Sequence, residues 1–163
     1  MFQIATKPSS TTDRIFKLAD GASTPKAAER LAGVTLTLRH PDLATRVAAR
    51  RAAWQEVGRH LPPEKQPEAS QNADATVPAV PSSMNMASDV IAFAEVAFGT
   101  ALTRLCAVSW TGVCGPEGSD DVPLNIETLI AAMADQDFYD AVCQLFVDPV
   151  LREDREANEE KKG

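Results

Sequence analysis

The chain has 163 residues, enough for one domain of ordinary size or for one domain with extensions. Its three cysteines are an odd number without a CxxC pair, which argues against an extracellular disulfide framework. The net charge of −7 is unevenly placed: residues 1–60 carry ten Lys/Arg against five Asp/Glu, and residues 61–163 carry six against eighteen. Such an asymmetry can steer two different partners, or one half can screen the other.

Residues 1–60 predict short strands followed by a basic helix. The start of the chain has no long apolar run of the kind a secretory signal needs, so we expect a protein of the cytoplasm. The stretch TPKAAERL predicts a short helix capped by Thr24, with Pro25 at its first position, and Gly33 stops it. The following VTLTLR at 34–39 alternates apolar and polar residues, which predicts a strand in a small antiparallel sheet.

Pro41 and Asp42 open a helix that we expect to run to about Arg59. Its expected apolar side consists of Leu43, Val47, Trp54, Val57 and Leu61, and its basic face consists of Arg46, Arg50 and Arg51. A basic helix face is the footprint that nucleic acid uses, although no aromatic residue is interleaved here to stack on bases. The alternative is a solvated face that balances the acidic C-terminal half.

Residues 61–86 are rich in proline and predict a linker or long loop. The prolines are Pro62, Pro63, Pro67, Pro78 and Pro81, separated by Ala, Ser, Gln and Asn. The apolar residues of this stretch have no helical or strand-like spacing. Such a stretch cannot bury enough apolar surface to offset its ordering entropy. We therefore expect it to separate an N-terminal part, residues 1–60, from a helical core at 87–150.

A long apolar helix is predicted over residues 88–108. One stripe contains Val90, Phe93, Val96, Ala101, Leu105 and Val108, and a second contains Ile91, Ala94, Phe98, Leu102 and Cys106. A helix that is apolar around most of its circumference is central or is covered by a partner. We expect one stripe to be exposed or used in self-association, because three short helices cannot cover both.

Two further helices are predicted, and a charged tail at 151–163 follows them. Asn125 caps the first, whose expected buried face is Ile126, Leu129, Ile130 and Met133. Asp135 or Asp137 caps the second, in which Phe138, Val142, Leu145 and Phe146 recur at helical spacing until Asp148 and Pro149 end it. The predicted fold is mainly α: a small helical bundle with a small N-terminal β-sheet and a Pro-rich loop.

Motifs for catalysis are missing from the sequence. We find no nucleophile elbow, phosphate loop or dinucleotide fingerprint, and therefore expect neither an enzyme nor a cofactor. The two histidines, His40 and His60, are not spaced to bind zinc, so no metal site is predicted.

Our candidates for partner binding are Trp110, Phe98, Leu102 and Val113. Trp110 follows the long helix beside a glycine, and a tryptophan at a contact is typical of a binding hot spot. Trp110 could equally close the hydrophobic core over the end of the helix, and both roles can coexist.

Several short strings resemble one known family. These are VSWTGVC at 108–114, the turn at Gly118, VPLNIETL at 122–129 and FVDPVL at 146–151. They are similar to the tail assembly chaperones of siphovirus-type phages and prophages, over roughly residues 90–160. The long N-terminal part and the proline-rich insert depart from that pattern.

The resemblance implies a protein of the host cytoplasm that keeps the tape measure protein soluble during tail assembly. It also implies a longer form, made by a −1 frameshift near Lys161 and Lys162, whose extension recruits tail tube protein. A chaperone of this kind needs apolar grooves for its client and surface charge for solubility. Self-association is possible, and neither a membrane nor nucleic acid is the expected partner. The alternative is a nucleic-acid-associated or regulatory phage protein that acts through Arg46, Arg50 and Arg51.

Overall fold

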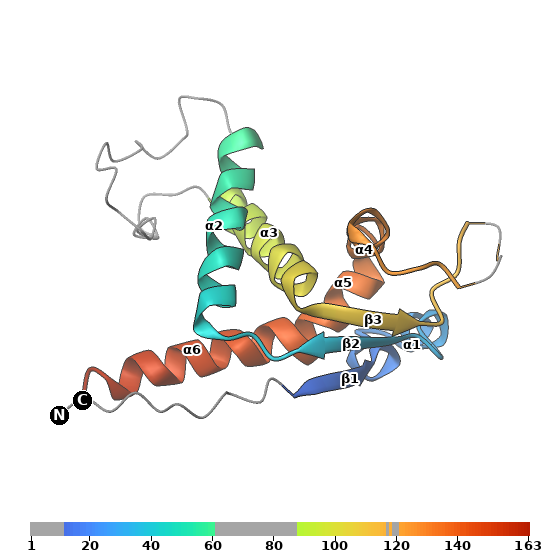
Figure 1. Ribbon diagram of the computed structural model, residues 1–163, viewed down its shortest axis with the longest axis horizontal. Coiled ribbons are helices and arrows are strands. Elements are labelled where there is room, and N and C mark those ends of the chain that lie inside the picture. Colours follow the sequence, from blue (N-terminus) through green and yellow to red (C-terminus); the bar gives the residue numbers. More distant parts are fainter. Residues whose placement is uncertain (1–11, 61–87, 117, 119–120) are drawn as a thin grey trace.

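The computed structural model describes residues 12–60, 88–116, 118 and 121–163, and shows a mainly α fold with a three-stranded antiparallel sheet. Figure 1 shows the sheet on one side of the molecule, with α2 and α3 rising from it and α6 extending away. The elements are β1 (Asp13–Lys17), a 3-10 turn (Leu18–Gly21), α1 (Pro25–Arg30), β2 (Thr35–Arg39), α2 (Leu43–His60), α3 (Ser88–Cys106), β3 (Ala107–Thr111), α4 (Ile126–Met133), α5 (Gln136–Val142), a π-helical segment (Cys143–Val147) and α6 (Asp148–Glu160). The predicted fold class is confirmed.

The sheet has the order β1-β2-β3 and joins distant parts of the chain. Leu36 of β2 pairs with Phe16 on one side and with Trp110 on the other, so these three side chains face the core. A bulge between Thr37 and Leu38 shifts the register with β3. The expectation of a helix to residue 108 was wrong here: α3 ends at Cys106, and residues 107–111 form a strand because β2 offers them an unpaired edge.

Two N-terminal predictions are confirmed. The Thr24 hydroxyl accepts a hydrogen bond from the Ala27 backbone N–H at 3.1 Å, with Pro25 in the first turn of α1. Alternation in β2 places Leu36 and Leu38 in the core and leaves Thr35 and Thr37 partly exposed on the opposite face. The Thr35 and Thr111 hydroxyls lie 2.7 Å apart on that outer face.

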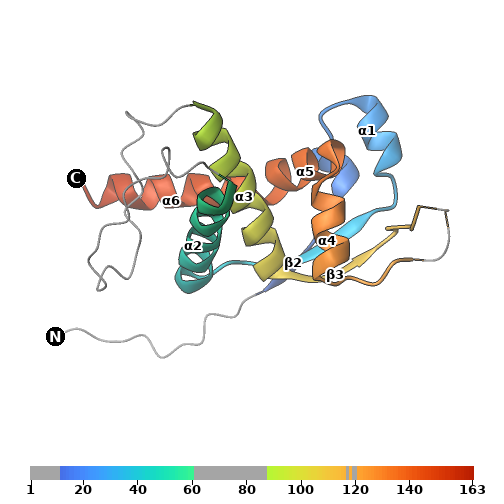
Figure 2. The same cartoon turned by 90° about the horizontal axis from the view of Figure 1, so that it is seen from above.

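The helices α2 and α3 pack side by side, as Figure 2 shows from above. On α2 the buried residues are Ala49, Ala53 and Val57, which recur every four positions. Leu43, expected on the buried side, is exposed instead. Small alanine side chains let the two helix backbones approach closely, whereas a stripe built from Leu43 would face away from α3.

The helix caps in the C-terminal half are largely as expected. Asn125 and Thr128 form a reciprocal capping box, with 2.9 Å from the Thr128 N–H to the Asn125 side chain and 3.0 Å for the return bond. Asp135, rather than Asp137, caps α5 by accepting from the Phe138 N–H at 3.1 Å. Asp135 also binds Arg30 of α1, and the hydrogen bond from that guanidinium holds the pKa of Asp135 below its usual range.

The buried face of α4 is narrower than predicted. Leu129 and Met133 are buried, but Ile126 and Ile130 are 60% and 46% exposed. The prediction for these two isoleucines was wrong because α4 touches the core along one side only, where α3 and α5 lie.

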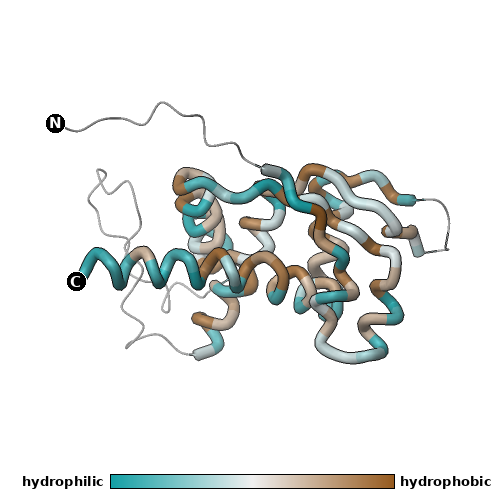
Figure 3. Tube along the Cα trace, turned by 90° about the horizontal axis from the view of Figure 1, so that it is seen from below, coloured by the Kyte–Doolittle hydropathy of each residue, from teal (hydrophilic) through white to brown (hydrophobic). Residues whose placement is uncertain are grey.

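Contrary to the prediction, the helical run that begins with α5 does not end at Asp148 and Pro149. The run continues from α5 through the π-helical segment Cys143–Val147 into α6, which reaches Glu160. Proline has no N–H to donate, and a wider π-turn just before it accommodates that loss. Figure 3 shows α6 passing from hydrophobic at its start to hydrophilic at its C-terminal end. The expected charged tail is therefore helical as far as Glu160.

A single hydrophobic core unites residues before and after the proline-rich stretch. It contains Leu36 and Ala53 from the N-terminal part together with Leu102, Phe138 and Phe146 from the C-terminal part. The boundaries expected at residues 60 and 87 therefore do not divide the fold. The predicted linker at 61–86 lies outside the described residues.

Candidate functional site

The central helix directs two of the candidate partner-binding residues into the core. Leu102 is 0% exposed and Phe98 is buried, and both belong to the main hydrophobic cluster. Leu102 does not reach the surface, whereas Phe98, although only 7% exposed, also lines a groove between α2, α3 and α6. Their structural role is to hold α3 against the rest of the molecule.

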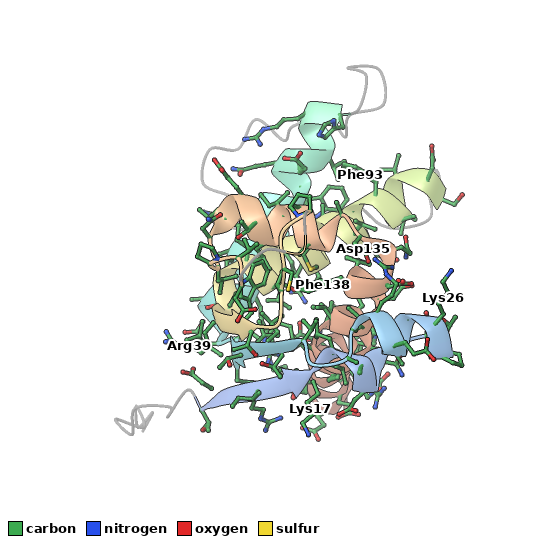
Figure 4. All side chains as sticks on the ribbon, turned by 90° about the vertical axis from the view of Figure 1, so that its right-hand side faces the viewer. Lys17, Lys26, Arg39, Phe93, Asp135 and Phe138 are labelled. Carbon is green, nitrogen blue, oxygen red and sulfur yellow. The ribbon has the colours of Figure 1, made fainter. Side chains whose placement is uncertain are left out.

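Trp110 closes the core beneath β3. Its indole N–H donates to the Val122 carbonyl at 2.6 Å, and its ring meets Phe138 edge-on, with centroids 6.4 Å apart. Figure 4 shows Phe138 in the interior of the molecule. Val113, half-buried, accepts a backbone hydrogen bond from Val122 at 2.8 Å. The residues that carry the family resemblance therefore close a structural loop, and Trp110 is unavailable to a partner in this conformation.

Most of the predicted basic face is engaged by α6. The Arg46 guanidinium, on a side chain only 13% exposed, binds Asp154 at 2.5 Å and Glu153 at 2.9 Å. Arg50 binds Asp154 at 2.6 Å, while Arg51 is exposed. Burial alone would lower the pKa of Arg46, but the two carboxylates outweigh it and the pKa is raised. These contacts support the interpretation that the basic residues balance the acidic C-terminal half.

We expect the contact between Arg46 and Asp154 to stabilise the fold measurably. A double-mutant cycle with Arg46→Ala and Asp154→Ala should give a coupling free energy of about 1–3 kcal/mol in urea unfolding, because both side chains are largely shielded from water. The matched control is the exposed pair Arg59 and Glu56, whose coupling should stay below about 1 kcal/mol. Equal coupling in the two cycles would contradict the assignment.

One groove lies between α2, α3 and α6 and has a volume of about 440 Å³. We call it the Tyr139 groove; its lining includes Trp54, Ile91, Ala94, Tyr139, Cys143 and Leu151. Burial raises the pKa of Cys143 to about 11 and also raises that of Tyr139, so both groups are protonated at neutral pH. A protonated thiol is a poor nucleophile, so Cys143 offers this groove apolar surface and no reactive thiolate.

A second groove, of about 510 Å³, lies between α2, α3 and α4. We call it the Phe93 groove; its lining includes Phe93, Val96, Ala97 and Ile130, together with Arg59, His60 and Arg104. Phe93 and Val96 are 38% and 47% exposed, and Phe93 lies on α3 beside the last turn of α2 (Figure 4). Its ring meets that of His60 with centroids 5.5 Å apart.

The apolar surface extends beyond the Phe93 groove. Ile126 lies one turn from Ile130 on the same face of α4, and Leu105 lies one turn from Ala101 on α3. Single exposed apolar residues are ordinary on protein surfaces, but a group of them rimmed by polar side chains marks an interaction site. The expectation of an exposed stripe on the central helix is confirmed in part: Phe93, Val96 and Leu105 are exposed, whereas Val90 and Ala101 of the same predicted stripe are buried.

Sequence reasoning named the buried stripe of the helix as the partner-binding one. Both stripes have helical spacing, so periodicity alone gives no reason to choose the Phe93 side. A signal did exist: two polar residues, Thr100 and Arg104, lie on the face of the helix that carries Phe93 and Val96, whereas only Glu95 interrupts the other stripe.

Comparison of the chain with protein-family models, curated proteins and solved structures finds no match. None of the described helices is long and apolar enough to cross a membrane.

Proposed function

We propose that this protein is a tail assembly chaperone of a siphovirus-type phage or prophage, which binds the tape measure protein in the host cytoplasm. The observation that carries the proposal is the exposed apolar surface of the Phe93 groove, flanked by Ile126 and Leu105. The family resemblance of residues 108–114 and 122–129 supplies the identity of the client. On this proposal the protein is not an enzyme.

The geometry suits a helical, apolar client. A helix can lay its apolar face into a groove between other helices, with anchors spaced three and four residues apart. The tape measure protein is, as the resemblance implies, long, helical and apolar. The excess of carboxylates on the chaperone would keep such a complex dispersed, since net charge opposes aggregation.

Co-expression tests the proposal. The tape measure protein of the same phage genome should be insoluble alone and should co-purify with the wild-type chain as a soluble complex. Phe93→Glu and Val96→Glu should each reduce the soluble fraction by about tenfold, because a carboxylate at the interface must be desolvated. The control is Ile15→Glu, which places the same charge on an exposed isoleucine of β1 outside the groove.

Thermal unfolding of each variant separates binding from folding, and the exposed positions should leave the melting temperature within a few degrees of the wild type. A tape measure protein that stays insoluble beside the wild-type chain contradicts the function. Equal rescue by Phe93→Glu, Val96→Glu and the wild type contradicts the site.

A further inference from the structure

The rim of the Phe93 groove is basic. Arg59 and His60 stand at the last turn of α2, and Arg104 stands in the last turn of α3. Arg59 and His60 belong to the net positive residues 1–60, and Arg104 adds a third basic side chain from the acidic part of the chain. Its floor is apolar, with Phe93 and Val96 exposed.

The basic rim is only partly neutralised from within. Glu56, the only carboxylate on α2 that lines the groove, lies 3.0 Å from Arg59 and 2.8 Å from His60. The hydrogen bond from His60 holds the pKa of Glu56 below its usual range. Among the described residues, no carboxylate lies within 4 Å of Arg104. An incoming carboxylate can therefore pair with Arg104 without breaking an ion pair that the described residues form.

The apolar floor also restricts the backbone of an occupant. Ala97, Ala101 and Ile130 offer no side-chain hydrogen bonds. A bound extended strand would bury its N–H and C=O groups without partners, which is costly, whereas a helix satisfies its own. The groove therefore favours a helix.

We propose that the Phe93 groove selects an amphipathic helix whose apolar stripe is flanked by acidic residues. The stripe lies on Phe93, Val96 and Ile130, and the carboxylates pair with Arg104 and Arg59. This deepens the proposed function, and rests on it for the identity of the client: segments of the tape measure protein with acidic flanks would be held first.

The basic rim also favours an acidic amphipathic helix over two other occupants, a second copy of this chain and a nucleic acid. A second copy that offered the same groove would bring Arg59 and Arg104 against their own equivalents, which repel. A nucleic acid would meet the cations, but its phosphates gain nothing from an apolar floor. Both occupants have distinct outcomes in the test below.

The test uses the full-length chain and two synthetic helical peptides of 18 residues. Both carry the same leucine stripe, flanked in one by glutamate and in the other by lysine, and binding is followed by fluorescence anisotropy at low salt. We expect the glutamate peptide to bind about tenfold more tightly than the lysine peptide, since two rim pairs at about 0.7 kcal/mol each give that ratio. The preference should shrink as salt is raised.

Arg104→Glu should remove or reverse the preference, while Arg152→Glu, the same charge change at an exposed position of α6 outside both grooves, should preserve it within about twofold. Equal affinity for the two peptides overturns the proposal, as does an Arg104→Glu variant that behaves like Arg152→Glu. The proposal is also overturned if the wild-type chain forms a dimer that Val96→Glu dissociates. It is overturned likewise if a short DNA duplex displaces the glutamate peptide.

The outcome is separable from that of the proposed function. If the wild-type chain and Arg104→Glu rescue the tape measure protein equally, the function stands and the charge selection is wrong. If the glutamate peptide is preferred but the tape measure protein is not rescued, the groove chemistry stands and the client is wrong.

Discussion

Replacing Leu102 by alanine is expected to lower the free energy of unfolding by about 2–5 kcal/mol. Leu102 is 0% exposed and belongs to the main hydrophobic core. Removing three carbon atoms there loses their transfer free energy and leaves a cavity that the packed helices can only partly close. Urea unfolding followed by circular dichroism measures the loss.

The matched control is Leu105→Ala, the same change on the same helix at a side chain 45% exposed. Much of that side chain already contacts water, so its loss should be below about 1.5 kcal/mol. If both variants unfold at the same urea concentration, Leu102 is not in the core. If Leu105→Ala is much the less stable, the exposed face of α3 has been assigned to the wrong side.

Replacing Gly112 by alanine is expected to destabilise the protein by about 2–5 kcal/mol. Gly112 follows β3 with φ of 75°, a left-handed conformation that costs a residue with a Cβ about 1–2 kcal/mol. A Cβ at this position would also overlap the carbonyl oxygen of Gly33, which belongs to the backbone and cannot swing away. Strand β3 would have to move from β2, or the turn would have to open.

Gly33→Ala separates these two causes. Gly33 has φ of 83°, but its Cβ would meet nothing within 4 Å. Its cost should therefore be the conformational one alone, about 1–2 kcal/mol. Thermal unfolding of both variants gives the difference, and a Gly112→Ala variant no less stable than Gly33→Ala would show that the close approach of the two turns is absent in solution.

The position of Gly112 also explains why residues 108–114 have the sequence that carries the resemblance. Trp110 and Gly112 act together: the indole holds Val122, and the glycine lets the chain pass the Gly33 turn. Residues that looked like a partner-binding motif are needed to close the loop after β3. These residues have a structural role, and the surface that we propose for a client lies elsewhere, on α3 and α4.

The sequence by itself determined the features that depend on neighbours three or four residues apart. The caps at Thr24 and Asn125 are hydrogen bonds of that kind, and the cap of α5 was limited to Asp135 or Asp137, of which the structure has Asp135. The alternation of β2 and the apolar character of residues 88–106 also follow from local spacing. For the site, spacing predicted an exposed stripe on α3 and could not say which one.

Only the tertiary structure decided which surfaces are paired. Arg46 meets Asp154 across 108 residues, and this contact turns an apparent basic face into a structural anchor for α6. β3 became a strand because the edge of β2 was open to it, and Ile126 and Ile130 became exposed because α4 touches the core along one side. Periodicity assigns a residue to one face of a helix, but what covers that face depends on where distant elements pack.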